Sequence, residues 1–72
     1  MILSQLLPDQ AIIQLTREEL IILNNALNEV YNGLDIQELS TRIGATLEDI
    51  EYLLHQIQDL INKLNEKDKS NK

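Results

Sequence analysis

The chain has 72 residues and a formal net charge of −6; 43% of its residues are hydrophobic and only 3% are aromatic. A chain of this length forms one domain and buries only about 60% of the surface that it exposes when unfolded. The absence of cysteine excludes disulfide scaffolds, thiolate zinc sites and cysteine nucleophiles. The two glycines are too few for a phosphate-binding loop, and the abundance of leucine and isoleucine favours a small helical bundle.

Residues 1–15 show no clear pattern of secondary structure. No Lys or Arg precedes the first apolar residues, so no signal peptide is predicted, and no apolar run approaches the about 20 residues that span a membrane. The apolar residues before Pro8 fit one face of a short helix: Ile2, Leu3, Leu6 and Leu7. Residues 11–15 fit an extended segment or a loop. We expect residues 1–15 to form a packing arm that covers the bundle or exchanges with a neighbour, in a cytoplasmic protein.

Three helix starts repeat one pattern, a capping residue followed three positions later by an acidic residue. The pairs are Thr16 with Glu19, Asp35 with Glu38, and Thr46 with Asp49. Gly33 and Gly44 stand where the C-termini of helices favour a left-handed residue. Together with apolar residues at helical spacing, these signals predict helices over about 17–32, 36–43 and 47–66.

Residues 36–54 resemble the helix-turn-helix motif of bacterial transcription regulators. The matching positions are the apolar, small and turn residues of that motif: Leu39, Ser40, Ile43, Gly44, Ala45, Thr46, Ile50 and Leu53. The resemblance implies an all-α, three-helix bundle over residues 16–66, with helix-turn-helix-like second and third helices. Residues 67–72 contain no apolar residue and are predicted to be a frayed polar tail.

A second resemblance covers most of residues 15–61. It rests on the segments Leu15-Thr16, Glu19-Leu20, Asn24 to Val30 and Thr41-Arg42-Ile43-Gly44. These segments resemble those of a family of small uncharacterised bacterial proteins. This resemblance implies a bacterial origin and no particular activity.

The distribution of charge argues against DNA binding. Residues 1–62 carry ten acidic and two basic side chains, a net charge of −8. The N-terminal half of a recognition helix would present Glu48, Asp49, Glu51 and Tyr52 to DNA. Because neutralisation of phosphates is the main source of DNA affinity, three carboxylates on this surface oppose binding. We therefore expect neither nucleic acid nor a membrane as a partner.

No catalytic, cofactor-binding or metal-binding residue is predicted. Glu51, His55 and Asp59 share one helix face at a spacing of four, but this face lies opposite the leucine stripe and should be solvated. None of the serines has a local histidine partner or a glycine turn that could bind an oxyanion. We therefore expect a protein that is not an enzyme and needs no cofactor.

The third predicted helix carries an apolar stripe that is too long for so small a bundle to cover. We predict that a second copy covers this stripe in a homodimer, through Ile57, Leu60, Ile61 and Leu64. Ile21 and Tyr52, two apolar residues on otherwise polar faces, are predicted to join the same interface. A second, polar set is predicted to face a protein partner: Asn24, Asn25, Asn28, Glu48, Asp49 and Glu51.

The sequence thus predicts a small acidic protein-interaction or regulatory module that self-associates through its third helix, in a parallel or an antiparallel pairing. One alternative is a DNA-binding helix-turn-helix transcription regulator. The other is an antitoxin or inhibitor that presents an acidic surface to a basic site on its partner.

Overall fold

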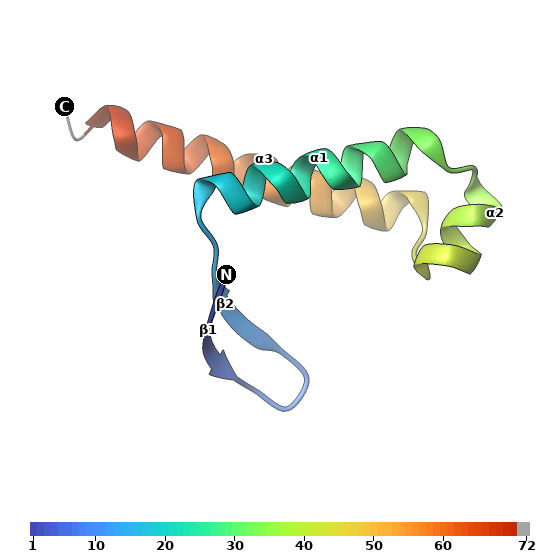
Figure 1. Cartoon of the computed structure of the whole chain (residues 1–72), viewed down its shortest axis with the longest axis horizontal. Coiled ribbons are helices and arrows are strands. Elements are labelled where there is room, and N and C mark those ends of the chain that lie inside the picture. The colour runs from blue at the N-terminus through green and yellow to red at the C-terminus, as the bar shows by residue number, and fades with distance from the viewer. Residues whose placement is uncertain (71–72) are drawn as a thin grey trace.

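The computed structural model describes residues 1–70, which form a β-hairpin followed by a pair of long helices (Figure 1). Strands β1 (Ile2–Leu6) and β2 (Ala11–Gln14) form an antiparallel sheet. Helices α1 (Arg17–Gly33) and α3 (Leu47–Ser70) lie side by side. The short helix α2 (Ile36–Glu38) and a π-helical turn, η1 (Leu39–Ile43), join them at one end. The fold is mostly helical with a small sheet, so the predicted all-α, three-helix bundle is wrong.

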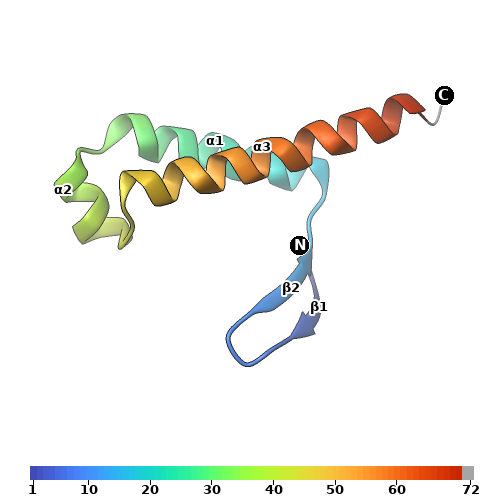
Figure 2. The ribbon, with the colours of Figure 1, turned by 180° about the vertical axis from the view of Figure 1, so that it is seen from behind.

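The predicted second helix, about 36–43, is helical over those residues, but only its first turn is α-helical (α2) and the rest is the π-helical turn η1. Its predicted cap is present, because the Asp35 carboxylate accepts a hydrogen bond from the Glu38 amide at 2.7 Å. The Thr41 hydroxyl donates to the Gln37 carbonyl at 2.9 Å, a side-chain bond that competes with the helical backbone pattern. The Gly44 amide donates to the Leu39 carbonyl at 3.0 Å, which closes a wider, π-type turn. The views from both sides show α2 and η1 as a corner at one end of the α1–α3 pair (Figures 1 and 2). The helix-turn-helix-like architecture is therefore also wrong.

The N-terminal segment is a hairpin that projects from the helices and does not cover them (Figure 2). Its turn spans residues 7–10 and is closed by the Leu7 amide, which donates to the Gln10 carbonyl at 2.9 Å. Pro8 favours such a turn because its ring presets the backbone angle. The signal for the hairpin was Pro8-Asp9 between two apolar runs. The spacing of Ile2, Leu3, Leu6 and Leu7 also fits one face of a helix, but the structure shows that residues 2–6 form a strand.

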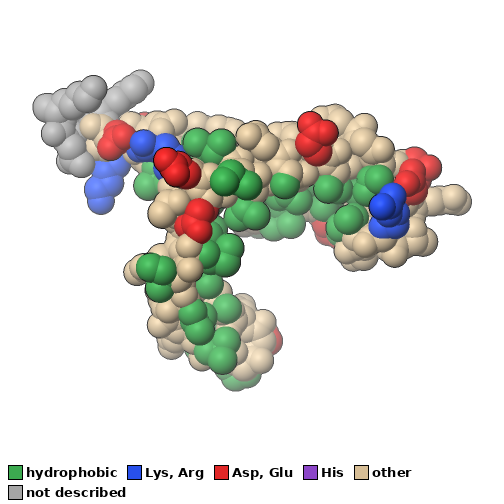
Figure 3. All heavy atoms as spheres, viewed as in Figure 1, with side chains coloured by type: hydrophobic (Ala, Val, Ile, Leu, Met, Phe, Trp, Pro, Cys, Tyr) green, Lys and Arg blue, Asp and Glu red, His purple; other side chains and the backbone are tan. Residues whose placement is uncertain are grey.

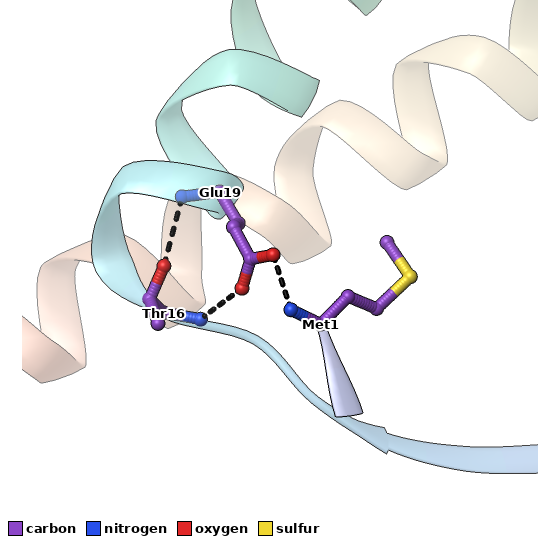
Figure 4. Close-up of polar contacts among 3 residues, drawn as sticks. All are labelled: Met1, Thr16 and Glu19. Carbon is purple, nitrogen blue, oxygen red and sulfur yellow. Dashed lines mark hydrogen bonds and ion pairs between the residues drawn. The ribbon is translucent and has the colours of Figure 1, made fainter. Parts of the chain in front are cut away.

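Helix α1 begins at the capping box that the sequence predicts. The Thr16 hydroxyl accepts a hydrogen bond from the Glu19 amide at 3.1 Å, and the Glu19 carboxylate accepts one from the Thr16 amide at 3.0 Å (Figure 4). The other carboxylate oxygen of Glu19 pairs with the amino group of Met1. Hydrogen bonds from this amino group and from the Thr16 backbone hold the pKa of Glu19 below its usual 4.5. This ion pair ties the base of the hairpin to α1.

Helix α3 extends beyond its predicted end because α1 supports it. The Arg17 guanidinium donates to the Leu64 carbonyl at 3.3 Å and to the Asp68 carboxylate at 2.6 Å. These contacts hold the last turns of α3 against the first residue of α1. The helix continues to Ser70, so residues 67–70 of the predicted polar tail are helical. Residues 71–72 lie outside the described residues.

The core of the chain is small. In the described part of the chain four hydrophobic side chains are buried, and no polar or charged side chain is: Leu20, Leu39, Ile50 and Ile61. Leu39, the first residue of η1, is fully buried and is the one buried residue of the corner formed by α2 and η1. Over residues 1–70, no helix combines the length and the apolar character that crossing a membrane requires.

The two glycines differ in backbone conformation, which predicts opposite effects of alanine. Gly44 has a φ of 75°, as the sequence predicts, whereas Gly33 lies inside α1 without a positive φ, and that part of the prediction is wrong. At neither position would an added Cβ meet another atom within 4 Å. We expect Gly33→Ala to raise the free energy of unfolding by about 0.5 kcal/mol and Gly44→Ala to lower it by about 1 kcal/mol or more. Urea unfolding at one fixed protein concentration checks both values, and changes of the same sign would contradict them.

Candidate functional site

The α1–α3 pair is a single layer of helices with two chemically different faces. Leu20 in α1 and Ile50 and Ile61 in α3 define the contact line between the helices. Because an α-helix turns once per 3.6 residues, the residues on the two sides of this line point to opposite faces of the layer. One face carries asparagine, acid and amide side chains; the other carries leucine, alanine and valine.

The polar face contains a shallow groove of about 480 Å³ between α1 and α3. It is lined by residues of both helices: Asn24, Asn28, Tyr31, Asn32, Glu51, Leu54, His55 and Gln58. At one end of the groove the Tyr31 hydroxyl donates to the Glu51 carboxylate at 2.5 Å. This hydrogen bond, then partial burial and the negative charge of Glu51, raise the pKa of Tyr31 above its ordinary 10.0. The bond joins the C-terminal part of α1 to the N-terminal part of α3.

The opposite face is apolar and uncovered; we call it the apolar face. It comprises Leu23, Ala26, Val30, Leu53 and Leu60. Leu53 and Leu60 are 44% and 48% exposed. Figure 3 shows hydrophobic side chains gathered along the edge of the helix pair from which the hairpin projects, and continuing along the hairpin. A layer of helices is stable only when its apolar side packs against a second layer.

The chain has more surface than a compact protein of its mass. Its accessible area is 5961 Å², whereas a compact monomer of 8.3 kDa exposes about 4,600 Å². Its radius of gyration is 14.5 Å, compared with about 11 Å for a compact domain of this length. The molecule measures only 16 Å along its shortest axis. The chain is therefore extended, with more exposed surface and fewer buried side chains than a compact domain of the same mass.

The six residues of the predicted dimer interface do not lie on one surface in the structure. Leu60 lies exposed on the apolar face, and Ile57 and Leu64 are half-buried beside it. Ile61 is buried against α1 in its own chain. Ile21 and Tyr52 are 40% and 64% exposed, but they point away from the apolar face. A helical wheel of α3 alone does not tell the buried Ile61 from the exposed Leu60, because the side of α3 that packs on α1 is decided by the tertiary fold.

The predicted partner-facing residues are only partly brought together. Asn24, Asn28 and Glu51 line the polar groove. Asn25 and Glu48 are exposed outside it, and Asp49 accepts a hydrogen bond from the Thr46 amide at 3.0 Å as part of the capping box of α3. Asn32, which the sequence groups with the other three asparagines of this helix, also lines the groove. The contribution of Gln58 was not predicted, although it shares a helix face with Glu51.

The apolar face ends in a smaller groove at the corner, which we call the corner groove. This groove has a volume of about 390 Å³. It is lined by Glu29, Val30, Gly33, Leu34, Arg42 and Ile43. Three of its lining residues are apolar and two are charged, one acid and one base. Ile43 is 46% exposed at its edge.

Another kind of site is a group of side chains that could hold a metal ion. Within residues 1–70, no three side chains among His, Asp and Glu lie close enough to hold a metal ion. Compared with protein-family models, curated proteins and solved structures, the chain matches none of them. Its function is therefore inferred from the geometry of its two faces.

The Tyr31–Glu51 bond predicts a pH dependence at alkaline pH. Because the pKa of Tyr31 is raised in the folded chain, the stabilisation is complete below pH 10 and is lost as the pH rises through the folded-state pKa. We expect Tyr31 in a Tyr52→Phe background to ionise above pH 10, and Glu51→Gln to lower that midpoint. Tyrosinate absorbance against pH measures both midpoints. An unchanged midpoint in Glu51→Gln would contradict the bond.

Proposed function

We propose that this protein is a small, non-enzymatic interaction module that self-associates, with two copies packed through the apolar face of α1 and α3. The observation that carries the proposal is the single helix layer, whose apolar side is exposed along its length. A second copy supplies the missing layer and turns two helix pairs into a four-helix core.

The missing area matches the size of a dimer interface. The accessible surface exceeds that of a compact monomer by about 1,400 Å², starting from the 5961 Å² of the chain. An interface of standard size removes about 800 Å² from each partner, and obligate homodimers remove more. A dimer through the apolar face therefore brings each copy close to the exposure of an ordinary folded protein.

The charge pattern allows a second copy to approach despite the net charge of −6. The apolar face has no charged residue in its middle, and Glu48, Glu51 and Asp59 project from other sides of α3. Two copies can thus meet without bringing these like charges together. Closed two-fold dimers are also the commonest symmetric assemblies, because one patch serves both partners.

The residues along one flank of α3 favour an antiparallel arrangement. Asp49, Leu53, Leu60, Lys63 and Lys67 recur at spacings of three, four or seven and form one stripe, acidic at its start and basic at its end. A two-fold axis across the middle of α3 places the acidic start of one stripe opposite the basic end of the other. The helix dipoles favour the same orientation.

In this dimer the two polar grooves lie on the outer surfaces. The groove of Asn24, Asn28 and Glu51 faces away from the apolar face and stays accessible in each copy. Its amide and carboxylate groups can donate to and accept from the backbone of a protein partner. The module would thus present two identical acidic, amide-lined surfaces.

The mass of the protein in solution tests this proposal. At about 100 µM, above the micromolar Kd of the weakest interfaces of standard size, we expect light scattering to give twice the chain mass of 8.3 kDa. Dilution should lower the mean mass toward that of one chain. A single-chain mass at the highest concentration would overturn the proposal.

No structural observation favours either alternative. A DNA-binding regulator would need cations where Glu48, Asp49 and Glu51 lie. An antitoxin or inhibitor would present its acidic groups to a basic site on another protein. A single-chain mass, combined with nanomolar binding to a purified basic protein, would favour that alternative.

A further inference from the structure

The hairpin has one entirely apolar face, which a β-bulge creates. Leu3 pairs with Ile13 and Leu6 pairs with Ala11. Between these pairs the register shifts by one residue at Ser4, so that Leu3 and Leu6 fall on the same side in spite of their odd spacing. Directly paired residues share a face. The bulge therefore gathers Leu3, Leu6, Ala11 and Ile13 on one side, which we call the hairpin face.

The opposite side of the hairpin is mixed in character. There Ile2 pairs with Gln14, and Ile12 pairs with Gln5. Two glutamines alternate with two isoleucines, as is usual for a side that meets water. The hairpin is thus amphipathic, and only its apolar face calls for a partner.

Nothing in its own chain covers the hairpin face. Every residue of both strands is exposed, with Leu3 at 57% and Leu6 at 73%. An isolated two-stranded hairpin is marginally stable in water and needs a hydrophobic surface to pack on. The hairpin projects from the same edge of the helix pair along which the hydrophobic side chains gather (Figure 3).

The hairpin and the corner lie at opposite ends of α1, at similar distances from its middle. The hairpin joins α1 at Thr16 and the corner begins at Leu34, about 13 Å on either side of the middle of α1. A two-fold axis through that middle, as in the antiparallel dimer, carries the corner of the second copy to the hairpin of the first. Strands of four to five residues are about 15 Å long, more than the about 10 Å thickness of a helix layer. The hairpin therefore extends alongside the second copy.

We propose that the hairpin face of each copy docks in the corner groove of the other, so that the hairpin is an exchanged arm of the dimer. This inference rests on the proposed self-association and adds which surfaces meet. Leu3 and Leu6 would pack on Val30, Leu34 and Ile43 of the second copy. Charge does not oppose this docking, since Asp9 in the hairpin turn is the only charged side chain of residues 1–14 and the groove is bordered by both Glu29 and Arg42. Arg42 pairs with Glu38 at 3.3 Å in its own chain.

Cross-linking between two single-cysteine chains tests the contact directly, because the natural chain has no cysteine. One chain carries Leu3→Cys and the other Ile43→Cys; they are mixed, allowed to exchange and oxidised. The matched control replaces the first chain by Gln5→Cys, on the opposite side of the same hairpin. We expect the mixed disulfide to form at least about ten-fold faster with Leu3→Cys, since contact raises the effective concentration of the thiols to the millimolar range.

The outcomes separate this inference from the proposed function. A dimer mass with equal oxidation rates for Leu3→Cys and Gln5→Cys would overturn the exchanged arm and leave self-association standing. A single-chain mass of the natural protein would overturn both. If Leu3→Cys does not fold, hydrogen exchange of the natural protein decides: amides of residues 2–6 and 11–14 should gain at least about ten-fold protection as the dimer forms. Protection that does not change with dimer population would overturn the exchanged arm.

Discussion

Leu60→Glu is expected to separate the two copies. Leu60 is 48% exposed in the single chain and lies near the middle of the apolar face, where a second copy would cover it completely. A carboxylate at that place loses water without gaining a partner, which costs several kcal/mol. We expect the Kd of the dimer to rise about 100-fold or more. Light scattering over a dilution series measures this change.

Asn62→Glu is the matched control. It adds the same charge two residues along α3, on the other side of the helix, where Asn62 accepts a hydrogen bond from the Gln58 amide at 3.1 Å. A carboxylate can accept the same bond, so we expect the Kd to change by no more than about three-fold. Equal effects of both variants would mean that charge repulsion, and not the apolar face, controls association. Ile61→Glu cannot serve as a test, because Ile61 is buried in its own chain.

Leu39→Ala is expected to destabilise the chain more than any other truncation at the corner. Leu39 is fully buried, and no other residue of α2 or η1 is buried. Loss of its side chain leaves a cavity that rigid neighbours fill poorly, at a cost of about 2–5 kcal/mol. The total stability of a 72-residue chain is about 4–11 kcal/mol. We therefore expect a large fall in the urea midpoint at fixed protein concentration.

Ile36→Ala provides the comparison for Leu39→Ala within the same corner. Ile36 is 71% exposed, so its truncation removes little buried area, and we expect a change within about 0.5 kcal/mol. Similar losses in both variants would show that the corner does not pack as described. A change in the slope of unfolding, without a change in midpoint, would point to the unfolded state instead.

The starts of the long helices could be predicted because they depend on neighbours in sequence. Thr16 with Glu19 and Thr46 with Asp49 satisfy backbone amides within one turn, and the structure confirms both capping boxes. Gly44 has its left-handed conformation because the chain must reverse before Thr46. Gly33 does not, because α1 ends at Leu34 in an extended conformation instead.

The hairpin could not be assigned with the same certainty. Leu3 and Leu6 have the spacing of a helix face, and only the bulge at Ser4 reconciles that spacing with a strand. Bulges depend on the pairing partner, in this chain Ile12 and Ile13, which no local pattern identifies. The end of α3 was underestimated for a similar reason, because its support by Arg17 comes from 47 residues away.

By itself the sequence determined where α1 and α3 begin, that disulfide chemistry is absent, and that the chain has more apolar stripe than so small a core can bury. These properties follow from local hydrogen bonding and composition. Only the tertiary structure decided which residues share a face. The packing of α1 on α3 brings Asn24 and Glu51 into one groove, buries Ile61 and leaves Leu60 exposed. Contacts between distant segments select one side of each helix, and periodicity within a helix carries no information about that selection.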